Sequence, residues 1–345
     1  MFIPLSNTSD FVLVSDHPDP LLLNHWDLAG FKFGTVLLEG DLLPSEELEL
    51  VSWGELVRLA DSRIEVDPEK LEISRTINSK IYQWDLRKED SLLSAKIITS
   101  EDNLLSELED VHSPVVLKAE YGLAGRNQIV LGQASESWKL SQIPKRLFGF
   151  PILMEEWVGE RRILDFSTLW DVENSKFRYL GNTVMAVDRD GTFRGIRIFK
   201  ESNPLVETFL PKIYSTVQSV SSKLTENYSG PCSVDGFFFR EDTIRCQPIS
   251  EFNFRYSIGR VLWELRQKRN PKSNESGILI LPYPKVETLN EWDWIQTQNE
   301  SLNGFLMYLT PVRDSKKKPY QNIVLYYETN SVDHFVEEIL SVWPS

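Results

Sequence analysis

The sequence predicts an α+β fold in which antiparallel strands dominate the centre of the chain. Two observations lead to this prediction. Short apolar runs joined by turn sequences recur between residues 113 and 260, and one longer stretch, 204–227, has apolar residues at helical spacing. The chain has 345 residues, which is too long for one small core, so we expect two or three lobes.

The first part of the chain is predicted to form a small α/β lobe. Residues 1–76 mix short apolar runs with Pro, Asp and Gly, and residues 46–60 carry an apolar pattern of helical period. Helices are then expected at both ends of 80–110. An apolar run at 115–119, a glycine turn at 122–125 and a second run at 128–131 predict a hairpin.

Further strands and helices follow in the second half. Strands are expected at 152–158, 163–169, 178–187 and 193–199, with Asp190-Gly191 as the turn between the last two. The helix at 204–227 has Pro near its start and Gly230 after its end. The remaining predicted elements are strands at 233–240 and 245–254, a helix at 258–267, a polar loop at 266–276, strands near 305–309 and 323–327, and a helix near 332–342.

The acidic composition narrows the class of partner. The formal net charge is −14 and the pI is about 4.9, which argues against a nucleic-acid or anionic-membrane partner. The two cysteines cannot cross-link a chain of this size, and a reducing, cytoplasmic location is expected. The apolar runs are too short to cross a bilayer. Four scattered histidines make a zinc site an improbable interpretation.

A candidate metal site lies in the hairpin predicted at 233–254. Asp235 is near the start of its first strand, and Glu251 and Asn253 are two residues apart on the second strand. Residues two apart on a strand project from the same face. Magnesium prefers hard oxygen ligands, which two carboxylates and an amide oxygen supply. The sequence therefore predicts a magnesium site here.

Arg255 continues on the face of Glu251, where its guanidinium could hold a phosphate or acyl-phosphate oxygen by paired hydrogen bonds. The alternative interpretation of this hairpin is the ordinary solvated face of an antiparallel sheet. Taken alone, an alternating Glu-Phe-Asn-Phe-Arg strand favours that alternative. Two further features at suitable distances weaken it.

The first feature is Lys118, which ends an apolar strand and precedes the loop from Gly122 to Arg126. Backbone N–H groups of a glycine loop can cover phosphates, and glycine allows close approach. The second feature is a pair of acids, Glu155 and Glu156, inside an apolar strand. One of them can point to solvent, but the other would be buried and needs a polar partner. That acid is predicted to meet an adenine amino group or a ribose hydroxyl.

Together these pieces resemble the ATP-grasp superfamily over residues 77–260. The resemblance starts at Asn78-Ser79-Lys80, continues through the lysine strand, the glycine loop and the acidic strand, and ends in the hairpin. Its most specific part is Val234-Asp235 followed by Glu251-x-Asn253-x-Arg255. Each of the earlier motifs is weak alone, but the motifs occur in an order and at a spacing that coincidence does not explain well.

The resemblance implies an ATP-grasp fold of three lobes, 1–76, 77–158 and 159–345, with ATP held between the central and C-terminal lobes. It implies ATP and Mg²⁺ as cofactors, with Mn²⁺ as an alternative ion. The residues that it assigns to nucleotide binding are Lys80, Lys118, Gly122, Gly125, Arg126, Glu155, Trp157, Val158 and Glu160. It assigns Asp235, Glu251 and Asn253 to the metal, and Arg255 and Lys118 to catalysis.

Members of this superfamily mostly activate a carboxylate as an acyl phosphate, which an amine or similar nucleophile then attacks. The resemblance therefore implies an ATP-dependent ligase, most simply one that forms carbon–nitrogen bonds, with ATP, an unidentified carboxylate and an unidentified amine as partners, and with a homodimer as a reasonable assembly. A kinase or phosphotransferase of the same fold and a non-catalytic nucleotide-binding protein stay open. Arg194 or Arg197 is a candidate for binding the substrate carboxylate, although exposed strand cations are the simpler interpretation.

Overall fold

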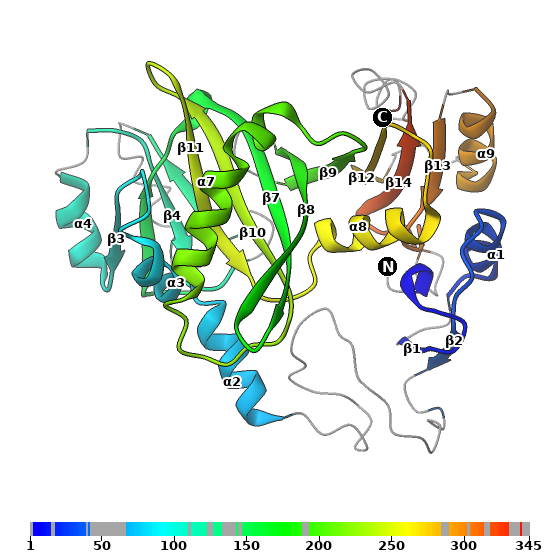
Figure 1. The fold of residues 1–345 in the computed structure, drawn as a ribbon, viewed down its shortest axis with the longest axis horizontal. Coiled ribbons are helices and arrows are strands. Elements are labelled where there is room, and N and C mark those ends of the chain that lie inside the picture. The colour runs from blue at the N-terminus through cyan, green and yellow to red at the C-terminus, as the bar shows by residue number, and fades with distance from the viewer. Residues whose placement is uncertain are drawn as a thin grey trace.

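The structure is built around two antiparallel sheets and a separate pair of parallel strands (Figure 1). This computed structural model describes residues 3–14, 18–38, 41, 67–109, 112–122, 127–132, 143, 147–187, 193–283, 290–301, 304–313, 318–330 and 339. The large sheet has eight strands in the order β11 (Ile244–Asn253), β10 (Gly230–Arg240), β7 (Arg162–Glu173), β8 (Lys176–Val187), β9 (Phe193–Phe199), β12 (Glu275–Pro282), β14 (Asn322–Thr329) and β13 (Gly304–Tyr308).

The small sheet forms a lobe at one side of the large one (Figure 1). Its order is β3 (Ala95–Ile98), β6 (Ile152–Glu156), β4 (Val115–Ala119) and β5 (Gln128–Leu131). Leu117, Ile129 and Met154 are buried in its core together with Leu104 of helix α4 (Glu101–Glu109). A short 3-10 helix, η2 (Gly159–Arg161), then leads from β6 into the large sheet.

Helix α7 (Pro204–Ser221) covers one face of the large sheet (Figure 1). The helix begins at Asn203, whose side chain accepts a hydrogen bond from the Leu205 N–H at 3.0 Å. Its apolar stripe is buried, as the helical spacing predicted, with Ile213 and Val217 fully covered. The stripe packs in one core with aromatic side chains of β7, β10 and β11.

The two ends of the chain share a second core. The N-terminal elements are η1 (Ile3–Leu5), β1 (Phe11–Val14), α1 (Pro20–Leu28) and β2 (Thr35–Leu38), with β1 and β2 parallel. They pack with β12, β13 and β14, with α8 (Ile258–Arg269) and with α9 (Glu291–Ser301). Trp26 of α1 is buried and donates its indole N–H to the Tyr308 carbonyl at 2.7 Å. This core anchors α8, and through it the segment that follows β11.

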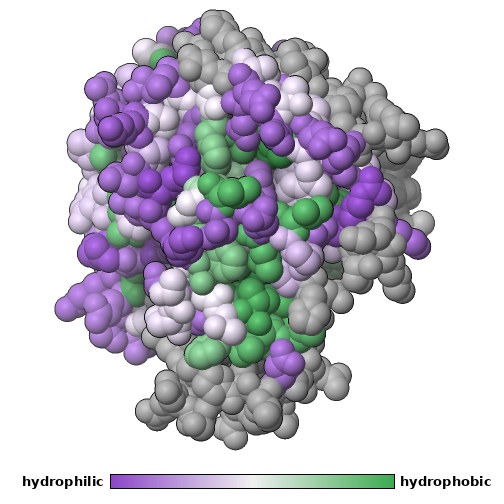
Figure 2. All heavy atoms as spheres, turned by 90° about the vertical axis from the view of Figure 1, so that its right-hand side faces the viewer, coloured by the Kyte–Doolittle hydropathy of each residue, from purple (hydrophilic) through white to green (hydrophobic). Residues whose placement is uncertain are grey.

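The side of the molecule that carries α1 has a band of apolar side chains (Figure 2). Helix α1 is apolar on more than one face, and it leaves Leu21 and Leu28 at 54% and 78% exposure. None of the helices in the described part of the chain is long and apolar enough to cross a membrane.

Helix α3 (Lys80–Arg87), which follows α2 (Pro68–Ile77), is held against the outer edge of β11 by two amide side chains. Gln83 donates to the Phe252 carbonyl and accepts from the Phe252 N–H, both at 2.9 Å. Asn78 accepts from the Phe254 N–H at 3.1 Å. These contacts satisfy backbone groups that an edge strand would otherwise expose. They also fix where Lys80, at the start of α3, lies relative to β11.

Most of the predicted elements are confirmed. The strands at 115–119, 128–131 and 193–199 have the predicted bounds, and the hairpin of β10 and β11 forms with Asp235 opposite Glu251. The pair β13 and β14 is antiparallel. Predictions for 46–60, Asp190-Gly191 and 332–342 lie outside the described residues, apart from Ile339.

Several predicted bounds are wrong, and the strand predicted at 163–169, for example, runs from Arg162 to Glu173. The helix predicted to reach 227 ends at Ser221, because the following Ser, Thr, Asn and Gly residues favour turns over helix. The loop predicted at 266–276 is helix up to Arg269, where cationic side chains suit a helix C-terminus and Asn270 caps it at a φ of 46°. Strand β12 then begins at Glu275. The strand predicted at 152–158 ends at Glu156.

Gly236 interrupts the register of β10 and β11 directly after Asp235. A Cβ at this position would lie 2.5 Å from Phe166 Cζ and 2.7 Å from the carbonyl oxygens of Gln247 and Pro248. We expect Gly236→Ala to lower the free energy of unfolding by about 1–3 kcal/mol, because overpacking forces neighbouring backbone to move. Urea unfolding measures this. Gly132→Ala is the control, since a Cβ there meets nothing within 4 Å, and an equal loss in both variants would contradict the prediction.

Candidate active site

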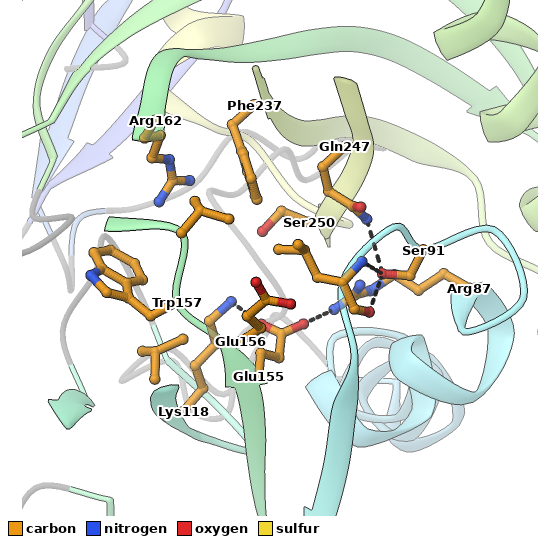
Figure 3. A pocket seen from close by; sticks show the side chains of 13 residues that line it. Arg87, Ser91, Lys118, Glu155, Glu156, Trp157, Arg162, Phe237, Gln247 and Ser250 are labelled. Carbon is orange, nitrogen blue, oxygen red and sulfur yellow. Dashed lines mark hydrogen bonds and ion pairs between the residues drawn. The ribbon is translucent and has the colours of Figure 1, made fainter. Parts of the chain in front are cut away.

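A cavity of about 370 Å³, including its open mouth, lies between the small sheet and the large one (Figure 3). Strands β4 and β6 of the small sheet, strands β7, β10 and β11 of the large sheet, and the segment after α3 supply its wall. The lining residues are Arg87, Ser91, Leu93, Val116, Lys118, Glu155, Glu156, Trp157, Val158, Arg162, Phe237, Gln247 and Ser250.

Glu155 is the centre of a buried ion network at the floor of this cavity. Its Oε1 accepts from Arg87 Nη2 at 2.5 Å, and its Oε2 accepts from Lys118 Nζ. Burial opposes the charge of Glu155, but Lys118 and Arg87 outweigh burial and lower the pKa of its carboxyl to about 2. Both oxygens are therefore engaged, and the contact of Glu155 with a nucleotide stays a prediction.

The opposite wall of the cavity is apolar and aromatic. Val158 and Phe237 are buried there, and Trp157 lies beside them. The Arg162 guanidinium carbon lies 4.2 Å from the Phe237 ring centroid and 5.6 Å from that of Trp157. A cavity with one charged wall and one aromatic wall suits a planar, polar ring that carries phosphates at one end.

Gln247 ties the segment after α3 to the large sheet at the cavity rim. Its Oε1 accepts from the Leu92 N–H at 2.8 Å, and its Nε2 donates to Ser91 Oγ at 3.2 Å (Figure 3). Gln247, Arg87, Arg162 and Phe237 line the cavity although the sequence did not predict them as site residues. No motif surrounds these polar residues in the sequence, and Phe237 looks like an ordinary core residue of a strand.

A second cluster brings together the residues predicted to bind metal. Asp235 and Glu251 are direct cross-strand partners on β10 and β11, and Asn253 Nδ2 donates to Asp235 Oδ2 at 2.9 Å. Burial and the neighbouring Glu251 carboxylate raise the pKa of Asp235 to about 6, although Ser167, Arg255 and Asn253 partly offset this. Like charges held side by side are costly, which is typical of a site completed by a cation.

Glu251 already has one cationic partner. Lys80 Nζ lies 2.6 Å from Glu251 Oε1, and both side chains are largely buried. Burial opposes the charge of Glu251, but Lys80, Lys118 and Arg255 outweigh burial and lower the pKa of its carboxyl. Lys118 thus acts electrostatically on Glu251 while it pairs with Glu155. Lys118 therefore links the cavity, whose wall it lines, to the acidic pair.

The donor set fits a magnesium ion. Two carboxylates and an amide are hard oxygen donors of the kind that magnesium prefers, and burial together with Glu251 raises the pKa of Asp235, which a bound cation would offset. Within the described ranges there is no group of three or more His, Cys, Asp and Glu able to hold a metal. A set of two acids and one amide leaves coordination positions for phosphate oxygens, which is the usual arrangement for magnesium at a nucleotide.

The other predicted site residues are placed less centrally. Glu160 is exposed on η2 and does not line the cavity. Gly122 is half-buried after β4, whereas Gly125 and Arg126 lie outside the described residues. Arg197 Nη1 lies 4.0 Å from the buried Glu275 Oε2 on the neighbouring strand β12. Arg194 is exposed on β9. The roles predicted for these residues stay predictions.

The chain is similar to several solved structures. A carboxyaminoimidazole ribonucleotide synthase from Aspergillus clavatus, complexed with ATP, matches with a TM-score of 0.59 and 12% identity over 98% of this chain and 98% of that one. An N5-carboxyaminoimidazole synthetase from Staphylococcus aureus, complexed with ADP, matches with a TM-score of 0.56 and 10% identity over 79% and 73%. Phosphoribosylamine–glycine ligase from Thermotoga maritima matches with a TM-score of 0.53 and 16% identity over 79% and 76%.

No protein-family model matches the sequence, and no curated protein matches it. The similar structures are all ATP-grasp enzymes, so the chain has the α+β ATP-grasp fold that the sequence predicted. Identities of this size establish the fold alone, and the activity is argued from the site.

Proposed function

We propose that this protein is an ATP- and Mg²⁺-dependent ligase that activates a carboxylate as an acyl phosphate for attack by an amine or similar nucleophile. The observation that carries the proposal is the joining of two clusters in one site. A cavity with Lys118 in its wall lies near the acidic pair Asp235 and Glu251, to which Lys80 and Arg255 add positive charge. Structures similar to this one were solved with ATP and with ADP.

In this proposal the base occupies the cavity and the phosphates point toward the acidic pair. Lys118 and Lys80 would exchange their carboxylate partners for phosphate oxygens, which are stronger partners because they carry more charge. Asp235, Glu251 and Asn253 would hold the ion, which when bound offsets charge that develops on the phosphates. Fixed cations in a closed site contribute more than they would in water.

The substrate carboxylate oxygen attacks the γ-phosphorus, and the bond from that phosphorus to the β–γ bridging oxygen breaks, so ADP leaves. The amine nitrogen then attacks the acyl carbon, the carbon–oxygen bond to phosphate breaks, and the amine loses a proton. Arg255 would hold the acyl-phosphate oxygens, because it lies two residues beyond Asn253, the last residue of β11, and acts electrostatically on Glu251. ADP release that depends on both an acid and an amine tests this proposal, whereas release without an amine would indicate a kinase.

The proposal extends to features that the fold leaves open. It includes a division into three lobes, 1–76, 77–158 and 159–345, with ATP between the last two. It also includes Mn²⁺ as an alternative to Mg²⁺. Cys232 and Cys246 are free and buried, which supports a reducing, cytoplasmic location. The acid and the amine are unidentified, and a homodimer is proposed as the assembly.

Lys118→Ala is expected to weaken ATP binding about tenfold or more, since it removes a charged donor from the junction of the two clusters. Calorimetric titration with ATP and Mg²⁺ measures the loss. Lys96→Ala is the control, because Lys96 pairs with Glu107 on the far side of the small sheet and is largely exposed. Unchanged affinity in Lys118→Ala would move the phosphate contact to another residue.

A further inference from the structure

Arg162 begins β7 at the aromatic wall of the cavity, and its guanidinium is held in place from two sides. It stacks against Phe237 at 4.2 Å, and its Nη2 pairs with Asp165 Oδ1 at 2.5 Å. Asp165 is buried. Figure 3 shows the guanidinium projecting from β7 toward the inside of the cavity, on the side where Trp157 and Phe237 lie. A planar group fixed in this way is pre-organised for directional hydrogen bonding.

One donor of this guanidinium is unused. Arg162 Nε is buried, and among the residues that the structure describes it has no hydrogen-bond partner. A buried donor without an acceptor is destabilising, so holding Arg162 in this position costs the fold some stability. Nε itself has almost no accessible surface, but the end of the guanidinium projects into the cavity (Figure 3), where an acceptor carried by a bound molecule can reach it.

The surroundings of Arg162 indicate what kind of acceptor this is. Trp157, Val158 and Phe237 make this part of the wall apolar, whereas Lys118 and Arg87 stand with Glu155 on the opposite wall. Phosphates suit the cationic side near the acidic pair, and a flat heteroaromatic ring suits the aromatic side. The only hydrogen-bond acceptors of an adenine base are its ring nitrogens, and each of them can accept one N–H.

We propose that Arg162 is a specificity-determining residue that donates from its guanidinium to a ring nitrogen of the bound adenine base. The inference rests on the proposed nucleotide site and adds to it a residue that reads the base. Asp165 is then a positioning residue, which pairs with Nη2 and holds the end of the guanidinium at the cavity.

The test compares ATP with its 1-deaza, 3-deaza and 7-deaza analogues by calorimetry in the presence of Mg²⁺. We expect Arg162→Met to weaken ATP binding roughly 10- to 100-fold, the size of one hydrogen bond from a charged donor. One of the three analogues should bind the wild-type protein with a similar loss. In Arg162→Met that same analogue should bind no more weakly than ATP does, because the interaction it lacks is already gone.

Arg161→Met is the matched control. Arg161 is the adjacent residue, carries the same charge, is exposed, pairs with the half-buried Glu156 and does not itself line the cavity. ATP affinity close to wild type is expected for it. Because Arg162→Met leaves Asp165 buried without its cation, Arg162→Met/Asp165→Asn is measured alongside, with thermal unfolding of every variant. Arg162→Lys keeps the charge but lacks the planar fork, and should show the same loss.

Two outcomes would overturn the inference while ATP still binds the wild-type protein. One is unchanged ATP affinity in both folded Arg162→Met variants. The other is equal binding of all three analogues and ATP to the wild type, which would place the donor on an atom other than a base nitrogen. Absence of any ATP binding to the wild type would overturn the proposed function itself, and the inference with it.

Discussion

Glu251→Ala is expected to abolish Mg²⁺-dependent ATP turnover, with a fall of at least about 100-fold, while the protein still folds cooperatively. Glu251 is the carboxylate of the acidic pair whose pKa is lowered, because Lys80, Lys118 and Arg255 outweigh its burial. A bound metal ion contributes several kcal/mol to stabilising a phosphoryl-transfer transition state, and each 1.4 kcal/mol corresponds to a factor of ten in rate. Glu251 is half-buried at a sheet edge and does not fill a core.

ADP release with a screened acid and amine measures this effect, and thermal unfolding checks the fold. Glu241→Ala is the control, because Glu241 lies at the opposite end of the same hairpin, is exposed and pairs only with surface arginines in the described structure. Normal turnover by Glu251→Ala would refute the assignment of this carboxylate to the metal.

Glu155→Gln is expected to lower the free energy of unfolding by about 3–5 kcal/mol at neutral pH. The substitution keeps the shape of the side chain but removes the charge that Arg87 and Lys118 share. The Arg87 side chain is only 4% exposed, so its cation would be left buried without a counter-ion. Removing one partner of a buried ion pair typically costs this much.

The same loss should depend on pH in a predictable direction. The pKa of Glu155 falls from an ordinary value of 4.5 to about 2 in the folded protein, because two cations outweigh burial. A lowered folded-state pKa means that the stabilisation is complete above about pH 4.5 and is lost as pH falls toward 2. The difference between wild type and Glu155→Gln should therefore shrink over that interval.

Urea unfolding at a series of pH values measures both effects. Glu156→Gln is the control, since Glu156 is the next residue, is half-buried and pairs with the largely exposed Arg161. Exposed pairs of this kind contribute at most about 1 kcal/mol. Equal destabilisation in the two variants, or a loss in Glu155→Gln that does not change below pH 4.5, would show that the network is not the buried ion cluster described here.

The sequence predicted those parts of the fold whose signals are local. Strands β4, β5 and β9 are short apolar runs between clear turns, and their bounds match the prediction. Strand β12 was missed because Glu275 and Ser276 read as a polar loop. Both are fully buried, and Glu275 accepts a hydrogen bond from Tyr327 on the neighbouring strand. Burial that depends on a distant partner is invisible to local periodicity.

The residues of the candidate site also fall into two groups, those that a local pattern predicts and those that long-range packing brings together. Asp235, Glu251 and Asn253 could be predicted because one hairpin brings them together. The ion pair of Lys80 with Glu251 joins residues 171 positions apart, and that of Arg87 with Glu155 joins residues 68 apart. Such pairs follow from how α3 packs against both sheets. No pattern in the sequence distinguishes Arg87 from an ordinary surface arginine at the end of a helix.

Calorimetric titration of ATP and of ADP into the purified protein, with and without Mg²⁺, tests the central claim most directly. That claim is one continuous site in which the cavity takes the nucleotide and the acidic pair takes the ion. We predict that both nucleotides bind, that Mg²⁺ strengthens ATP binding, and that Glu251→Ala removes this strengthening. Absence of binding under both conditions, or binding that Mg²⁺ does not affect, would contradict the account.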